Sequence, residues 1–281
     1  VKTYLREGPA AADFEAVDVL PSLVREASAF LGRQRGSATP FFLYVALNAP
    51  HTPILPSAPY AGKSGLGPYA DFVMQVDSAV GTILDGLARN GQDRNTLVIV
   101  TSDNGCSPMA DFKALTAHGH NPSGPWRGAK ADIFEGGHRI PFLARWPGQI
   151  PAGTRCGDTI CLTDLFATCA GILGTSLPKD AGEDSVNILP DLLGTATGPL
   201  REATVHHSIN GSFAIRQGPW KLALCPDSGG WSEPKPGASE AKKLPPNQLY
   251  HLNDDPAEQR NLLAEQPEIV ERLRGLLERY V

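Results

Sequence analysis

Two apolar runs of strand length, each ending in a polar loop, constrain the fold of this chain most strongly. Residues 41–47 (FFLYVAL) and 96–101 (TLVIVT) consist mainly of aliphatic and aromatic residues. Such runs are typical of strands buried on both faces, as in a parallel sheet. Between them, residues 68–91 place apolar side chains at helical spacing. This order predicts a right-handed βαβ unit whose ligands collect beyond the carboxyl ends of the strands.

The other periodic segments extend this pattern into an α/β fold with a smaller C-terminal part. Spacing predicts helices over 18–31, 165–173 and 269–280, and strands over 140–146, 213–216, 220–224 and 248–252. We expect a mostly parallel central sheet with helices on both faces in residues 1–200. Residues 201–281 are expected to form a small α+β subdomain with an antiparallel sheet. Residues 105–139 lack periodicity and predict a long functional loop.

Composition excludes several classes of function. The chain has 25 basic and 30 acidic residues without a basic cluster, so nucleic acid is not an expected partner. Its longest purely apolar run, residues 41–47, is far shorter than the ~18 residues that indicate a membrane span. Five cysteines without a C-x-x-C pair predict neither a zinc ribbon nor a disulfide framework. Cys156 and Cys161 could pair, but two buried thiols are the favoured interpretation.

Asp103 and Asn104 follow the second apolar strand directly. A carboxylate and an amide carbonyl at one strand end supply the hard oxygen ligands that Ca²⁺ or Mg²⁺ requires. Asp-Asn-Gly is also common turn chemistry, and the residues alone favour this interpretation. The place beyond a strand end, where ligands bind in such folds, narrows the difference between the turn and a cation site.

His51 and Lys130 are the other candidates for chemistry. His51 lies between two prolines just past the first apolar strand, where a stiff backbone would hold its ring. Lys130 lies in a glycine-flanked segment, where a compact positive charge can contact an anion. Each residue also has an interpretation without a function: His51 as an exposed loop histidine, and Lys130 as a solvated surface lysine.

Four blocks together resemble the formylglycine-dependent sulfatases of the alkaline-phosphatase superfamily. They are PFFLYVALNAPHTP (40–53), LVIVTSDNG (97–105), GPWRGAKADIFEGGHRIPFLARWPG (124–148) and QLYHLNDDPAEQRNL (248–262). The resemblance implies an alkaline-phosphatase-like fold, incomplete in this chain. It also implies that Asp103 and Asn104 are Ca²⁺ ligands, with Mg²⁺ the less favoured ion, and that His51 and Lys130 contact the sulfate group or its leaving oxygen.

Two further residues are candidates for substrate binding under the same resemblance. His118 lies in the histidine-containing run Ala-His-Gly-His, and Arg127 lies in the block that contains Lys130. His118 resembles a substrate-subsite residue of the carbohydrate-type members, and a loop histidine without a role is an equally good interpretation. The expected partner is a small-molecule or saccharide sulfate ester, and the family implies a periplasmic or secreted location. Nothing in the sequence indicates an oligomeric state.

The family's nucleophile is a formylglycine made from the cysteine or serine of a Cys/Ser-x-Pro-x-Arg motif, and two neighbouring aspartates also bind its cation. Residues 106–110 (Cys-Ser-Pro-Met-Ala) contain the cysteine and proline, but Ala110 stands where arginine is required. We therefore reject Cys106 as the nucleophile. We expect the formylglycine and the paired aspartates in an N-terminal segment outside this sequence, so that this chain alone is inactive.

The resemblance implies that the intact enzyme is a sulfuric ester hydrolase. A phosphodiesterase or phosphonate hydrolase of the same superfamily is the first alternative, because a tetrahedral anion beside a divalent cation suits either chemistry. A non-catalytic protein that binds sulfated glycans is the second. Turnover of an aryl sulfate against an aryl phosphate separates the enzymes, and glycan affinity without sulfate release identifies the binding protein.

Overall fold

The computed structural model describes residue 9 and residues 11–281. The chain forms two compact units. The first extends to Arg94 and also contains residues 109–118. The second contains residues 95–108 and 119–281. Short 3-10 helices lie at Ala16–Asp18, Asp93–Asn95, Pro108–Ala110 and Ala241–Lys243. The boundary expected at residue 200 stays a prediction.

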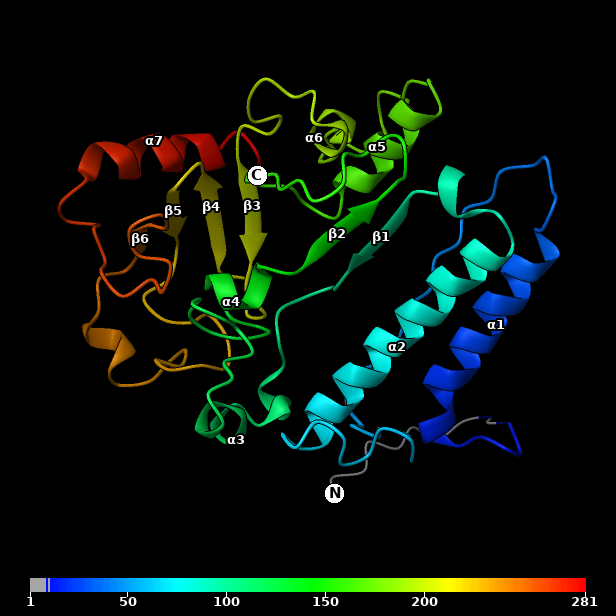
Figure 1. The fold of residues 1–281 in the computed structure, drawn as a ribbon. Helices are drawn as coiled ribbons and strands as arrows, with labels where there is room; N and C mark the ends of the chain where they lie inside the picture. Colours follow the sequence, from blue (N-terminus) through cyan, green and yellow to red (C-terminus); the bar gives the residue numbers. More distant parts are fainter. Residues whose placement is uncertain (1–8, 10) are drawn as a thin grey trace. The chain divides into compact units, whose positions relative to one another are not determined.

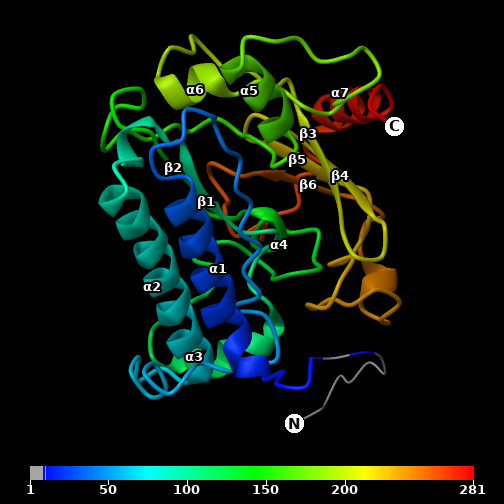
Figure 2. The same ribbon diagram turned by 90° about the vertical axis from the view of Figure 1, so that its right-hand side faces the viewer.

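A helix pair dominates the first unit. Helix α1 spans Val19–Arg33 and α2 spans Pro68–Arg89, which confirms both predicted helices. The two helices pack side by side (Figures 1 and 2). Their contact is apolar, with Leu20, Phe72 and Ala79 buried at its centre. Proline opens α2, where its missing N–H costs no hydrogen bond. The short helix α3, Phe112–Ala117, completes the unit.

The strand predicted over residues 41–47 is not formed. These residues have no assigned secondary structure, and none of the described strands pairs with them. Phe42 and Tyr44 are 81% and 80% exposed, whereas the residues between and beside them are half-buried. A strand needs a partner for its backbone hydrogen bonds, so an apolar run alone does not make one. The predicted βαβ unit and parallel sheet are therefore not observed among the described residues.

The second unit contains two antiparallel sheets. Strand β1, Val98–Thr101, pairs with β2, Phe142–Arg145, with Val98 opposite Arg145. Four strands form the other sheet in the order β3-β4-β5-β6, namely Thr204–His207, Phe213–Gln217, Trp220–Ala223 and Gln248–His251. The antiparallel sheet predicted for the C-terminal part is confirmed, although β3 was not predicted. Helices α5, Asp164–Ile172, and α6, Leu189–Leu193, lie in the connection between the sheets.

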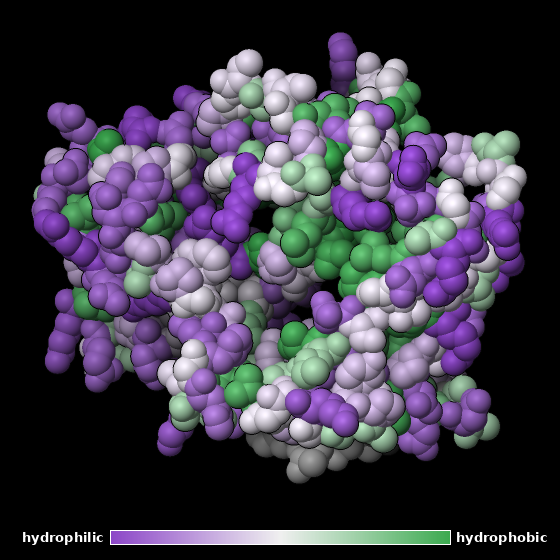
Figure 3. Space-filling model, in the orientation of Figure 1, coloured by the Kyte–Doolittle hydropathy of each residue, from purple (hydrophilic) through white to green (hydrophobic). Residues whose placement is uncertain are grey.

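The four-stranded sheet is covered on both faces. Helix α7, Pro267–Leu277, packs on one face against Ile215, Leu222 and Leu249 (Figure 1). The alternate residues of the same strands point to the other face, where they bury Ile133 and Phe134 of the long loop. The outer side of α7 is hydrophilic, and the surface over the C-terminal elements is mostly hydrophilic in the space-filling view (Figure 3). The sheet therefore holds residues 133–134 in place.

The remaining expectations have mixed outcomes. The long loop predicted over 105–139 contains two short helices, α3 and α4 (Glu135–His138), so it is only partly irregular. None of the five cysteines forms a disulfide, so Cys156 and Cys161 are not bonded to each other. Cys156 is exposed, so the expectation of two buried thiols was wrong for this residue. No helix in the described part of the chain is both long enough and apolar enough to span a bilayer.

Candidate functional site

The loop after β1 holds the two expected cation ligands. Asp103 is exposed and Asn104 is half-buried. The side-chain amide of Asn104 donates to the backbone oxygen of Gly105 at 2.9 Å, which turns its own carbonyl oxygen elsewhere. Ser102 donates to the backbone oxygen of Asn104 at 3.1 Å and fixes the turn. The loop therefore presents two oxygen donors from adjacent residues.

This loop is docked onto the segment that contains Lys130. The backbone N–H of Gly105 donates to Gly137 at 2.9 Å, and that of Lys130 donates to Cys106 at 2.8 Å. A Cβ atom at residue 105 would overlap the backbone oxygen of Gly136. Glycine is therefore required where the two segments cross. The structure thus brings Asp103, Asn104 and the backbone of Lys130 into one place.

A buried carboxylate shapes the segment around Lys130. Asp132 is fully buried, and it accepts hydrogen bonds from the backbone N–H groups of Ala129 and Trp231, both at 2.8 Å. Ala131 has a φ of 83°, a conformation that residues with a side chain rarely adopt. Such strain persists only where the surroundings enforce it, and it is frequent at functional sites. Lys130 itself is half-buried beside this strained residue.

An ion cluster ties this segment to the C-terminal sheet. Glu135 is buried, and its carboxylate lies 3.1 Å from both Lys221 and Arg216 and 3.3 Å from Arg139. The ammonium of Lys221 also lies 2.9 Å from the carboxylate of Glu258. In addition, the backbone N–H of Glu135 donates to Glu258 at 2.7 Å. The cluster therefore joins α4, β4, β5 and the loop after β6.

The charges of the cluster act differently on its two acids. Burial favours the neutral form of Glu135, but the charges of Lys221 and Arg216 outweigh it and lower the pKa of this carboxyl. Burial raises the pKa of Glu258, and the charge of Lys221 offsets this only in part. Glu135 is therefore the more firmly ionised of the two, and it anchors the segment that follows Lys130.

Arg127 belongs to the same assembly. Its guanidinium donates to the backbone oxygen of Glu258 at 2.9 Å and lies 3.8 Å from the centre of the Phe134 ring. These contacts support the loop from inside the second unit. A role of Arg127 in substrate binding stays a prediction.

The two candidate histidines lie in the first unit. His51 is exposed, and its Nδ1 lies 2.8 Å from the backbone oxygen of Thr52, which orients the ring. His118 is exposed at the end of α3. The structure thus brings Asp103, Asn104, Arg127 and Lys130 together within the second unit. The catalytic role of His51 and the substrate role of His118 stay predictions.

One stretch that matches the nucleophile pattern was overlooked in the sequence. Residues 123–127 read Ser-Gly-Pro-Trp-Arg, which has serine, proline and arginine at the required positions. Ser123 is only 6% exposed, however, and its hydroxyl donates to the backbone oxygen of Gly128 at 2.8 Å. Arg127 is held against Glu258 and Phe134 as described above. Ser123 therefore stabilises the turn before Lys130 and is not presented as a nucleophile.

Other supporting residues were missed as well. Glu135 and Glu258 lie inside two of the four sequence blocks that resemble sulfatases. Their place in these blocks was the one sequence feature that pointed to them. Asp132 stands in the same block as Glu135. Lys221 lies outside every block, and only its burial in the folded chain reveals it.

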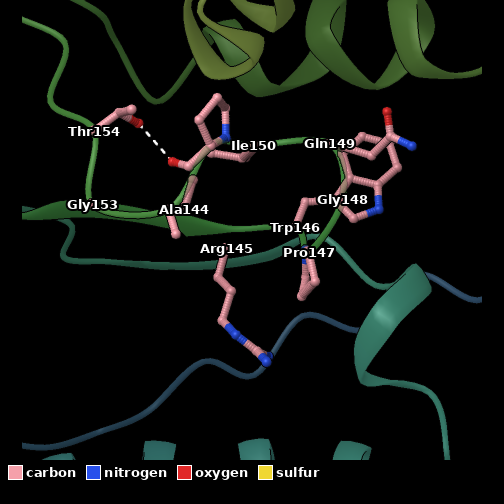
Figure 4. Close-up of a pocket in the computed structure, with 11 residues that line it drawn as sticks. Ala144, Arg145, Trp146, Pro147, Gly148, Gln149, Ile150, Gly153 and Thr154 are labelled. Carbon is pink, nitrogen blue, oxygen red and sulfur yellow. Dashed lines mark hydrogen bonds between the residues drawn. The ribbon is translucent and has the colours of Figure 1, made fainter.

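A separate pocket of about 680 Å³ lies along residues 144–154 (Figure 4). One continuous segment after β2 lines it, and Thr154 donates to the backbone oxygen of Pro151 at 2.9 Å. None of the candidate site residues lines this pocket. Its position therefore does not mark the site described above.

Comparison with known protein families identifies one family model, described as Sulfatase, which matches residues 21–175. An N-acetylgalactosamine-6-O-sulfatase of Bacteroides thetaiotaomicron is 35% identical over 93% of this chain and 50% of its own length. Human arylsulfatase A is 34% identical over 84% of this chain and 48% of its own length. The chain spans about half the length of these curated relatives.

Solved structures give the same result. A Bacteroides thetaiotaomicron structure from a study of the metabolism of multiple glycosaminoglycans superposes with a TM-score of 0.82 at 33% identity. It covers 95% of this chain and 55% of the other. Ps i-CgsB in complex with k-i-k-neocarrahexaose superposes with a TM-score of 0.74 at 26% identity. That match covers 93% of this chain and 54% of the other.

Proposed function

Since this chain belongs to the sulfatase family of the alkaline-phosphatase superfamily, we propose that the protein hydrolyses sulfate esters. The observation that carries the proposal is a backbone hydrogen bond, in which the N–H of Lys130 donates to the carbonyl oxygen of Cys106. Cys106 lies two residues after Asn104. This hydrogen bond joins an ammonium-bearing loop to a loop with two oxygen donors. A sulfate group has negative oxygens that suit both a cation and an ammonium group.

The residues of this chain fit part of a Ca²⁺ site. Asp103 and Asn104 supply two hard oxygen ligands, and the amide orientation of Asn104 leaves its carbonyl oxygen available. Ca²⁺ takes 6–8 oxygen ligands, so further donors are required. Bound there, the cation would neutralise charge on the sulfate oxygens.

The other roles follow from chemical type. Lys130 provides a fixed positive charge for a sulfate oxygen that gains charge as the ester bond breaks. His51 would stabilise or protonate the departing alcohol, since an imidazole is a suitable general acid. The nucleophile, a formylglycine in this family, is not expected within this sequence. A sulfated saccharide is the proposed substrate class, supported by the names of the relatives and by the oligosaccharide bound to a structural neighbour.

The test compares two proteins made from the same gene. One is the 281-residue chain, and the other is the product extended upstream to the gene's start codon. We expect the extended protein to release sulfate from 4-nitrophenyl sulfate and to lose this activity with EDTA, whereas the shorter chain releases none. Faster turnover of the diester bis(4-nitrophenyl) phosphate by the extended protein would favour the phosphodiesterase alternative. Glycan affinity without turnover of either ester would favour the binding protein.

A further inference from the structure

The loop from Cys225 to Pro234 lies against the segment that contains Lys130. The carboxylate of Asp132 accepts from the backbone N–H groups of Trp231, at 2.8 Å, and Ser232, at 3.0 Å. A Cβ atom at residue 230 would overlap the backbone oxygen of Ala131. Asp227 and Ser228, earlier in the loop, are 6% and 0% exposed. The backbone at Trp231 is therefore fixed by its hydrogen bond to Asp132, which lies two residues after Lys130 in the sequence.

The side chain of Trp231 nevertheless remains outside the core. It is 46% exposed, whereas the other three tryptophans of the chain are half-buried. Ile209 is also exposed, at 59%, and its backbone N–H donates to Ala131 at 3.0 Å. Two exposed apolar side chains thus come from loops bonded to residues 131 and 132. Leaving an indole in water on a rigid loop forgoes the stabilisation that burial would give.

A second tryptophan lies close to Lys130 in the sequence, but its ring is already in contact with an arginine. Trp126 lies in the same block as Lys130, but the guanidinium of Arg139 covers its ring at 4.8 Å from the centre. Trp231 is therefore the most exposed of the four tryptophans, and its loop contacts residues 131 and 132, next to Lys130.

We propose that Trp231 forms the platform against which the sugar ring of a sulfated saccharide packs, and this inference rests on the proposed function. A sulfate held by Lys130 is bonded directly to the rest of its ester, so the ring must lie within a few ångströms of the sulfate. A Cβ atom at residue 230 would lie only 2.5 Å from the backbone oxygen of Ala131, so the loop of Trp231 crosses the chain directly beside Lys130. The C–H face of a sugar ring is apolar, and a rigid indole contacts such a face with little loss of entropy.

The test measures binding to the full-length protein by calorimetry, with N-acetylgalactosamine 6-sulfate as the sugar probe and inorganic sulfate as the probe without a ring. Trp231→Ala is expected to weaken binding of the sugar probe roughly tenfold, the order of one lost aromatic contact, and to change sulfate binding less than about twofold. Trp231→Phe should retain most of the affinity because it keeps an aromatic face. Phe166→Ala is the matched control, since Phe166 is 52% exposed on α5.

Three results would overturn the platform. Unchanged affinity of Trp231→Ala for the sugar probe is the first, and an equal loss for both probes, which would indicate a displaced Lys130 loop, is the second. The third is that Trp231→Ala loses more affinity for 4-nitrophenyl sulfate than for the sugar probe, because Trp231 would then select an aryl ester. Failure of the unsubstituted protein to bind inorganic sulfate or to turn over any sulfate ester would instead contradict the proposed function itself.

Discussion

The ammonium of Lys221 and the carboxylate of Glu258 lie 2.9 Å apart, and both side chains are fully excluded from solvent. Lys221 also pairs with Glu135, only five residues beyond Lys130 in the chain. The buried charge of Lys221 in the C-terminal sheet thus helps to fix the segment that contains Lys130, on which the proposed chemistry depends. A buried pair is costly to break, since the remaining charge loses its partner without regaining water.

Removal of Lys221 should therefore be strongly destabilising. Lys221→Met leaves Glu258 without its cation and is expected to lower the free energy of unfolding by about 3–5 kcal/mol. Urea denaturation measures this loss. Arg260→Met is the control, because its pair with Glu265 is exposed, and it should change stability by about 1 kcal/mol or less. Equal effects of the two substitutions would contradict the central role of the cluster.

The glycine at residue 105 is a second sensitive position. Gly105→Ala would drive a methyl group into the backbone oxygen of Gly136, and backbone atoms on both sides must move. We expect a clear drop in Tm together with weaker cation binding, because Asp103 and Asn104 are displaced along with the loop. Gly81→Ala provides the comparison, since space is open around Gly81 in α2 and alanine is the better helix former. A normal Tm for Gly105→Ala would show that the loops are not docked in this way.

Two half-buried histidines, each with a ring nitrogen shielded from water, predict how stability depends on pH. The rings of His138 and His206 lie 4.2 Å apart near Lys221. Burial, followed by the charge of Lys221, lowers the pKa of His138 to about 4 and moves that of His206 well below its usual value. A histidine in the unfolded chain has a pKa of about 6.5, so between about pH 4 and 6.5 the unfolded chain binds more protons than the folded chain does. Stability should therefore fall as the pH drops from about 6.5 towards about 4.

Thermal unfolding at several pH values tests this dependence. His138→Gln should flatten the decline in Tm across that window, because one group that prefers to be protonated only in the unfolded state is gone. His120→Gln, at an exposed position, should leave the decline unchanged. A parallel decline in all three proteins would rule out His138 as its source.

The sequence predicted those elements whose pattern is local. Helices α1, α2, α5 and α7 follow from apolar spacing, and the C-terminal hairpin follows from its turn. Residues 41–47 failed because apolar character does not supply the hydrogen-bond partner that a strand requires. The loop positions of Asp103 and Lys130 were predicted, but Lys221 was not. Its partners are 86 residues before it at Glu135 and 37 residues after it at Glu258, and no local pattern reports such pairs.

The turn at Ser123 provides a test of the overlooked nucleophile pattern. Formylglycine formation would remove two hydrogen atoms from serine, a change that mass spectrometry of the peptide containing Ser123 detects. We expect unmodified serine in the full-length protein, because the buried hydroxyl holds Gly128 in place. A modified Ser123 would make this chain carry its own nucleophile and would overturn the expectation that the chain alone is inactive.

Lys130 is the residue on which the proposed chemistry depends most directly. Lys130→Ala in the full-length protein should lower kcat for 4-nitrophenyl sulfate by about 10²–10³, the usual cost of losing one preorganised charge partner. Its side chain is half-buried and its backbone N–H bond to Cys106 survives the substitution, so stability should change by only about 0.5 kcal/mol.

Lys130→Arg separates charge from shape at the same position. The planar guanidinium does not replace a compact ammonium group in a tight site, so this variant should also turn over poorly although its charge is kept. Lys113→Ala, at an exposed position in α3, serves as the control for removal of a lysine. Steady-state kinetics and thermal unfolding are measured on the same preparations. Near-normal turnover of Lys130→Ala, or a loss that merely follows the loss of folded protein, would show that this lysine is a solvated loop residue without contact to sulfate.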